Sequence, residues 1–448
     1  MKHYQQTEIP RAKDMMLPVN HSPLLKNIWL GVVVGIFTGL VVGLFRWIID
    51  QTLILLTVVY PFMRQHPTWL IPYVLGTVIV VFLIAYLVRP YAIDLIGSGV
   101  PQIKAILAGR HKMNWWQVLW RKFIAGLLTI CPGLFLGREG PCIQIGACIG
   151  QGVNQHFSHE HDQQNLFIAC GAAAGLSAAF SAPVAGAVFL LEEISHNFKA
   201  RIWVPALAAS ISADLMTFIF FGTKPCLYLP LHHQLPLQAY PWLILIGLVI
   251  GGVAYLFQYC LFNLKWWYRK FTVVPQAYHS ILPLLLVIPV GLWNPRLLGG
   301  SHNLIVMVTN FSLNHHWLLI LGTLIVFAVL RFVGTMIAYG AAVPGGIFMP
   351  IFVIGSLLGA IAGIILVHAG MLDSSGYLTM IALGMAAFFA ATEGTPFSAI
   401  LLVTEMVGSI EQILPMTILV FIAYYTSIFL GAQPSLYDAL LQNMNFDH

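Results

Sequence analysis

Charged side chains are too rare in this sequence to cover a water-soluble protein. Only 8% of the 448 residues are Asp, Glu, Lys or Arg, whereas soluble domains carry about 25%. Hydrophobic residues make up 59% of the chain, and its mean hydropathy is +0.84. These values exclude a cytosolic enzyme and place nearly all of the chain in lipid. Long apolar runs replace the alternating pattern of a β-barrel, so we expect an all-α polytopic membrane protein.

The basic residues predict how the chain is oriented. Residues 1–27 are polar and are expected to form a cytoplasmic segment without a signal peptide. Lys and Arg gather at Arg110–Lys122, Lys199–Arg201 and Lys265–Lys270, and the positive-inside rule makes these loops cytoplasmic. Six cysteines show no metal-binding spacing. We therefore expect free thiols and predict neither a metal nor a cofactor.

Several apolar segments are shorter than the roughly 20 residues that span a bilayer. They are cut by clusters of Gly and Pro at Gly97–Pro101, Gly137–Pro141, Pro183 and Gly345–Pro350. Short, interrupted helices are the sequence pattern of a transport site near the midplane of the membrane.

The chain also repeats itself. GREGPCIQIGACIG (137–150) matches GIFMPIFVIGSLLG (346–359) at five identical positions, 209 residues later. A second block, residues 171–193, aligns with residues 384–406 and pairs Pro183 with Pro396 and Glu192 with Glu405. Two collinear blocks indicate an internal duplication, in which each half supplies one wall of a central site.

Three motifs are predicted to open helices inside the bundle. They are GSGVP (97–101), GREGP (137–141) and GGIFMP (345–350). Each provides free backbone N–H groups and the positive end of a helix dipole, which together favour an anion. Partial charges, unlike Lys or Arg, would let the ion leave again. The alternative is that these glycines and prolines only allow close helix packing.

Glu139 is the most informative single residue. A carboxylate at mid-bilayer depth costs about 2.5–3.5 kcal/mol, which marks it as functional by default. At a helix N-terminus the ionised side chain would take the place of an anion. Protonation would let the side chain leave that site, so that an anion could bind there. The alternative is a helix cap paired with Arg138.

Glu192 and Glu193 end an apolar segment shortly before Lys199. Glu192 has the counterpart Glu405, which favours a structural role shared by both halves. Glu193 aligns with Met406, and this broken symmetry makes it the better candidate for proton uptake from inside. The alternative for both is an interfacial charge in water.

These motifs, together with GAAAGLSAAFSAPVAG (171–186) and the duplication, resemble the CLC family of chloride channels and transporters over residues 28–442. The resemblance implies a CLC-type fold of tilted, broken helices in two inverted repeats, and a homodimer with one pathway per subunit. Residues 28–448 would form a single transmembrane domain, with repeats at about 28–222 and 240–442.

The resemblance also implies roles for individual residues. The hydroxyls of Ser98 and Tyr437 and the amides of Ile347 and Phe348 would bind a central chloride. The outer chloride site would use a second set of backbone amides, those of Arg138, Glu139 and Gly140. Glu139 is similar to the external gate and Glu193 to the internal proton acceptor of exchangers. A chloride/proton antiporter is therefore expected, with a voltage- or pH-gated chloride channel as the alternative.

Some positions depart from the family pattern. Gln102 and Lys104 stand where transporters often carry acidic residues, Met349 replaces an alanine, and one extra residue adjoins Tyr437. The end of the chain leaves no room for cytoplasmic CBS domains, so a bacterial plasma-membrane protein is expected.

Two other functions are compatible with parts of the sequence. His156, His159, Glu160, His161 and Asp162 are compatible with a metal loop but are expected to be a solvated one. Gly175–Ala178 resembles the rhomboid nucleophile motif; Ser177, however, lies in the duplicated block opposite Ala390 and lacks a convincing base.

Overall fold

The computed structural model describes residues 24–158, 163–196, 198–231, 235–270, 274–311 and 316–444. Within these ranges the chain is helical, and its β structure is limited to two isolated bridges. The helices of the N-terminal half are α1 (Leu24–Gln65), α2 (Leu70–Val88), α3 (Ala92–Leu95), α4 (Val100–Leu107), α5 (Trp115–Ile130), α6 (Glu139–Val153), α7 (Gln164–Phe180), α8 (Pro183–Phe189) and α9 (Ala200–Phe221).

The helices of the C-terminal half are α10 (Tyr240–Arg269), α11 (Ile281–Trp293), α12 (His302–Thr309), α13 (Trp317–Gly340), α14 (Phe348–His368), α15 (Gly376–Glu393), α16 (Pro396–Val407), α17 (Ile413–Phe429) and α18 (Leu436–Gln442). One π-helical turn, η5 (Leu190–Ile194), follows α8.

Membrane-spanning character is confirmed by helix length and composition. Eight helical segments among the described residues are long and apolar enough to cross a bilayer, and α7, α16 and α17 are shorter apolar helices. The predicted breaks also occur where expected. Pro183 and Pro396 each begin a short helix, because proline fits the first helical turn but cannot continue the preceding helix.

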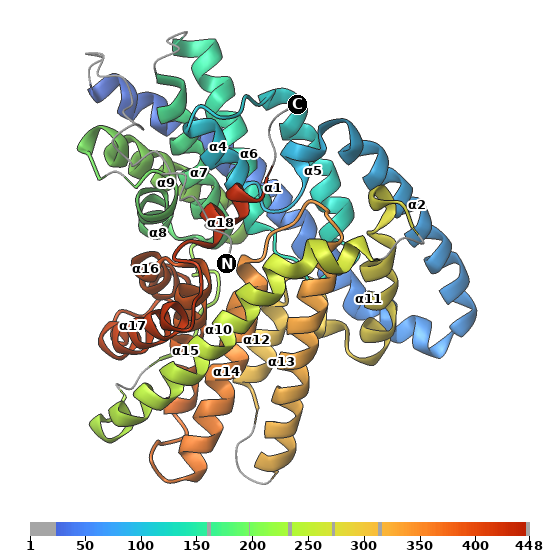
Figure 1. Cartoon of the computed structure of the whole chain (residues 1–448), viewed down its shortest axis with the longest axis vertical. Helices are drawn as coiled ribbons and strands as arrows, with labels where there is room; N and C mark the ends of the chain where they lie inside the picture. Colours follow the sequence, from blue (N-terminus) through green and yellow to red (C-terminus); the bar gives the residue numbers. More distant parts are fainter. Residues whose placement is uncertain are drawn as a thin grey trace, which may run out of the picture.

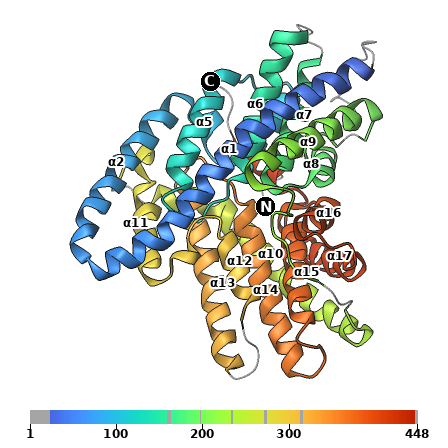
Figure 2. The ribbon, with the colours of Figure 1, turned by 180° about the vertical axis from the view of Figure 1, so that it is seen from behind.

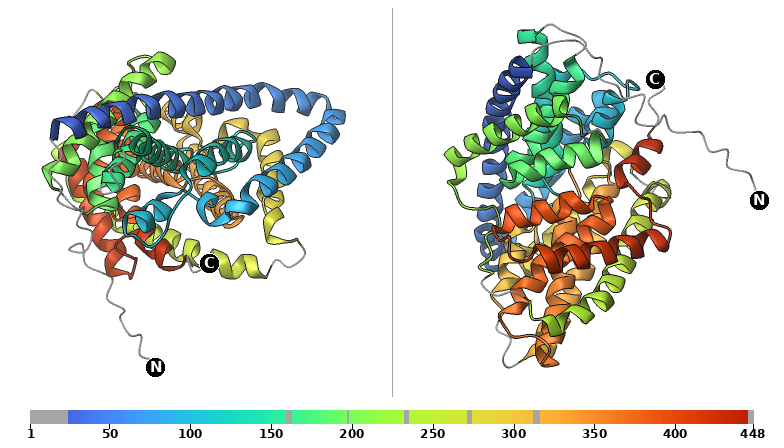
Figure 3. Two further views of the ribbon diagram at one scale, coloured as in Figure 1. Left: turned by 90° about the horizontal axis from the view of Figure 1, so that it is seen from above. Right: turned by 90° about the vertical axis from the view of Figure 1, so that its left-hand side faces the viewer.

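The two halves of the chain occupy two blocks (Figures 1 and 2). In Figure 1 most of the N-terminal half lies above the C-terminal helices α13 to α17, and the terminal helix α18 reaches back into the upper block to contact α4. The side view shows the same division, and the view from above looks down through the two blocks (Figure 3).

Corresponding helix pairs form the centre of each block. In the upper block α6 packs on α7 so closely that a Cβ on Gly146 would lie 2.0 Å from the Gly171 carbonyl oxygen. In the lower block α14 packs on α15, and a Cβ on Gly355 would lie 2.6 Å from the Gly384 carbonyl oxygen. The glycines shared by the two sequence blocks therefore serve the same close approach in both halves.

Two glutamates exchange helix caps between the halves. Glu192 accepts hydrogen bonds from the amides of Phe397 and Ser398 at the start of α16. Glu405, on α16, accepts from the amides of Val184 and Ala185 at the start of α8. Each carboxylate thus satisfies N–H groups that a helix cannot satisfy itself and faces a positive dipole end. These contacts give Glu192 the structural role, shared with Glu405, that the sequence predicts.

Removing either cap should destabilise the fold to a similar extent. Glu192→Ala and Glu405→Ala are each expected to lower the free energy of unfolding by about 1–2 kcal/mol, because two helix N–H groups lose a charged acceptor. Thermal unfolding in detergent measures the change, with exposed Glu411→Ala as the control. Unfolding temperatures equal to that of the control would contradict the exchanged caps.

Candidate functional site

The three motif loops are joined by backbone pairing. Gly97 donates to the Val343 carbonyl at 3.0 Å, and Gly345 donates to the Gly97 carbonyl at 3.2 Å. Gly137 and Gly346 exchange two hydrogen bonds, of 2.7 and 2.8 Å. These bridges bring the N-terminal ends of α4, α6 and α14 to one junction, so the convergence predicted from sequence is present.

Ser98 lies against the start of α6. A Cβ on Gly140 would approach the Ser98 Cα and Cβ to 2.7 and 2.6 Å, so only glycine allows this contact. Gly99 takes a φ of 91° before α4, and the Ser98 hydroxyl is buried beside the Val100 amide. The predicted hydroxyl ligand therefore sits within the junction.

Tyr437 reaches the same junction from α18. Its ring stacks on that of Phe348, the first residue of α14, with centroids 6.0 Å apart. Ile347 is the N-cap of that helix, and α18 also contacts α4. Thus the elements that carry Ser98, Ile347, Phe348 and Tyr437 meet, although they are far apart in the sequence.

The Glu139 carboxylate occupies the space between two helix N-termini. Its side chain is 1% exposed, and a Cβ on Gly137 would meet both the Glu139 Oε2 and the Met349 amide nitrogen. The Oε2 atom has no hydrogen-bond partner among the described residues. Arg138 is the N-cap of α6, and Glu139 and Gly140 are its first residues. The carboxylate therefore lies beside backbone N–H groups that could hold an anion.

Arg138 has another partner, which weighs against the capping alternative for Glu139. Its guanidinium forms a hydrogen-bonded ion pair with Asp50 of α1, whereas its Nε lies 3.9 Å from the Glu139 Oε1. Asp50 is therefore the closer carboxylate partner of Arg138.

Glu193 lies in a separate polar cluster. Lys104 donates to its Oε1 at 2.9 Å, and the Ser435 hydroxyl donates to the same oxygen at 2.6 Å. Lys104 also binds Asp438 at 2.6 Å. Glu193 is 1% exposed, so it is not the solvated interfacial charge of the alternative interpretation. The departure at Lys104 gives Glu193 a direct cationic partner.

Two buried basic residues, Lys122 and Arg331, stabilise the broken helices. The sequence alone did not indicate this role. Lys122 donates to the carbonyls of Leu95 and Gly97 just before α4. Arg331 binds the carbonyls of Leu297 and Gly299 just before α12. Lys122 and Arg331 align with each other in the internal duplication. This alignment is the sequence feature that could have indicated their common structural role.

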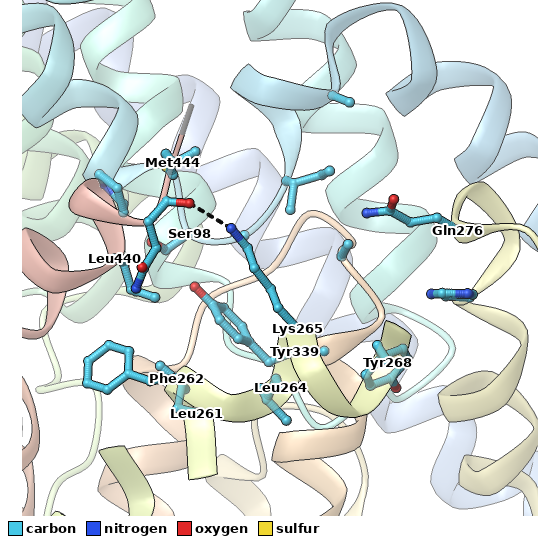
Figure 4. Close-up of a pocket in the computed structure, with 18 of the residues that line it drawn as sticks. Ser98, Leu261, Phe262, Leu264, Lys265, Tyr268, Gln276, Tyr339, Leu440 and Met444 are labelled. Carbon is cyan, nitrogen blue, oxygen red and sulfur yellow. Dashed lines mark hydrogen bonds between the residues drawn. The ribbon is translucent and has the colours of Figure 1, made fainter. Parts of the chain in front are cut away.

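An open cavity of about 880 Å³ leads to the junction from one side. Ser98 and Tyr339 line it together with Leu261, Lys265 and Tyr268 of α10 (Figure 4). Lys265 donates to the carbonyl of Asn443, another lining residue, at 2.7 Å. The volume of the cavity has room for hydrated ions next to Ser98.

The structure gives no support to the other candidate chemistries. The Ser177 hydroxyl donates to the Ser210 carbonyl at 2.8 Å. No group of three potential metal ligands occurs among the described residues. His156 binds the Gly152 carbonyl at 2.8 Å, and the rest of the suggested loop, His159 to Asp162, lies outside the described residues.

Fold and site together define a helical membrane protein built around a junction of backbone amides. Residues 80–428 match the family described as voltage gated chloride channel. The chain is also 32% identical over 382 residues to the H(+)/Cl(-) exchange transporter ClcA of Vibrio cholerae, covering 84% of this chain and 80% of that protein. The chain therefore belongs to the voltage gated chloride channel family.

Solved structures agree with this assignment. A slow cyanobacterial Cl-/H+ antiporter superposes with a TM-score of 0.85 at 28% identity, covering 95% of this chain and 98% of that one. A CLC-type fluoride/proton antiporter shares the fold, with a TM-score of 0.72 at 23% identity over 94% of this chain and 99% of that one. The predicted CLC-type architecture of broken helices is confirmed.

Enlarging Gly140 should disturb the junction. Gly140→Ala is expected to destabilise the protein by about 1–3 kcal/mol, because the new methyl group collides with the Ser98 backbone. Gly252→Ala is the matched control, since its Cβ would meet no atom within 4 Å. Unfolding temperatures in detergent compare the two variants, and equal values would show that the loop contact is not tight.

Proposed function

We propose that this protein exchanges chloride for protons across the membrane. The observation that carries the proposal is the Glu139 carboxylate among converging backbone amides. The same amides can serve a chloride ion once the side chain is protonated and leaves, which couples anion occupancy to a proton. The relatives named as exchange transporters support this function over that of an enzyme.

The central chloride site would be formed by the Ser98 and Tyr437 hydroxyls and the amides of Ile347 and Phe348. Their support is the meeting of α4, α14 and α18 around one junction. The amides of Arg138, Glu139 and Gly140 would form the outer site at the start of α6. Dipoles and hydroxyls without a direct cation would bind chloride weakly enough for release.

The cavity at Ser98 would be the cytoplasmic entrance for the anion, since Lys265 on its wall belongs to the basic segment Lys265–Lys270 that is expected on the inside. Glu193 would accept the proton from the cytoplasm by a separate route. The buried ion pair of Glu193 with Lys104 favours a second candidate function, a passive chloride channel of the same fold. The cation stabilises the ionised form of Glu193, and a carboxylate that stays ionised would not carry protons.

The remaining assignments belong to the same proposal. Residues 1–27 would lie in the cytoplasm, and residues 28–448 would form one transmembrane domain of two inverted repeats, about 28–222 and 240–442. The protein would function as a homodimer with one pathway per subunit in a bacterial plasma membrane. It would need no cofactor.

Proteoliposomes with simultaneous chloride and pH recording test the exchange. A chloride gradient is expected to drive protons uphill through the wild-type protein. Glu139→Gln should retain chloride flux and lose proton movement, because an amide cannot carry the proton. Chloride flux through the wild type without proton movement would leave the channel as the function; coupled transport by Glu139→Gln would remove Glu139 from the gate.

Glu193→Gln tests the internal step in the same assay. Proton flux is expected to fall by about tenfold or more while chloride still passes, since the variant lacks an acid at the inner end of the route. Glu192→Gln, one residue away and engaged in the cap of α16, is the matched control and should stay coupled. Equal coupling in both variants would mean that protons bypass Glu193.

A further inference from the structure

Glu393 is a buried acidic residue that has no role in the proposed exchange as described above. It ends α15 and is 0% exposed. The Tyr437 hydroxyl donates to its Oε1 at 3.3 Å, and its Oε2 has no hydrogen-bond partner among the described residues. The C-terminal end of a helix is electrostatically the less favourable end for a negative charge.

Among the described residues, no basic side chain forms an ion pair with Glu393. The charged groups near it are Glu193 and Lys104 of the neighbouring polar cluster. Lys104 is already bound by Glu193 at 2.9 Å and by Asp438 at 2.6 Å. A buried carboxylate without amide donors or a paired cation is strongly disfavoured, so the arrangement suits the protonated, neutral acid.

The place of Glu393 is fixed by the backbone around it. Gly394 has a φ of 87°, and a Cβ there would lie 1.8 Å from the Pro434 carbonyl oxygen. Gln258 of α10 also clamps the two segments, donating to the Thr392 carbonyl at 2.7 Å and accepting from the Gln433 amide at 2.8 Å. The end of α15 is therefore held against residues 433–438.

That segment connects the two carboxyl groups. Ser435 contacts Glu193 at 2.6 Å, and Tyr437, two residues later, contacts Glu393. Tyr437 in turn packs on Phe348 at the start of α14. Glu393 thus stands between the Glu193 cluster and the junction of the three loops.

We propose that Glu393 is an additional proton-binding site that carries the proton between Glu193 and Glu139 beside the central anion site. This inference rests on the proposed exchange of chloride for protons. The neutral acid gives its proton to the Glu139 carboxylate and becomes a carboxylate. It then takes a proton from the Glu193 acid, which returns to its ionised form, so one proton moves and no other bond changes.

The relay is tested by measuring chloride and proton flux through the Glu393→Gln variant in proteoliposomes. Glutamine keeps the shape of the glutamate side chain but has no acidic proton to transfer. Chloride flux is expected to persist, while protons moved per chloride fall by about tenfold or more. Glu393→Asp should restore coupling, and exposed Glu411→Gln is the control for the chemical change. If the wild type is coupled and Glu393→Gln moves as many protons per chloride, the relay is overturned while the exchange stands. If the wild type is uncoupled, the exchange itself fails.

Wild-type protein provides a readout that does not depend on a variant. Dicyclohexylcarbodiimide reacts with protonated carboxyls in apolar surroundings and not with solvated carboxylates. At neutral pH, mass spectrometry of the labelled protein is expected to find the adduct on Glu393 and not on Glu411. An unmodified Glu393 would show that it is not held as the protonated acid and would overturn the relay.

Discussion

Backbone pairing between loops that are distant in sequence holds the candidate site together. Isolated bridges join Gly97 with Pro344 and Gly137 with Gly346, and a Cβ on Gly346 would meet the Gly140 amide nitrogen at 2.9 Å. In an apolar bundle each pairing also satisfies N–H and C=O groups that lipid could not satisfy. Helix dipoles, the Ser98 hydroxyl and the Glu139 carboxylate all take their positions from these short contacts.

The basic side chains around the junction bind oxygen atoms of the protein and do not contribute directly to the anion site. Lys122 and Arg331 bind carbonyl groups at the ends of broken helices, Arg138 binds Asp50, and Lys104 binds Glu193. Each basic side chain is thereby occupied by protein oxygen atoms. The space between the helix N-termini keeps a positive potential that comes from amide dipoles, which an anion can leave more easily than a fixed charge.

Much of the architecture could be predicted because glycine and proline mark helix breaks locally. The starts of α4, α6 and α14 follow directly from GSGVP, GREGP and GGIFMP. Contacts across the bundle could not be predicted in this way. Glu393 was missed, although it aligns with Phe180 in the duplicated block and so breaks the symmetry as Glu193 does. The ion pair between Lys104 and Glu193 depends on how α4 packs, which no local pattern encodes.

The exchanged caps have a consequence for how such a chain could arise. Glu192 serves the helix that carries Glu405, and Glu405 serves the helix that precedes Glu192. Mutual contacts of this kind are those of a two-fold symmetric interface between identical subunits. A half-length ancestor with one such glutamate and one such helix would contain both partners, and two copies would complete both caps. Fusion of two copies would then join an interface that already existed.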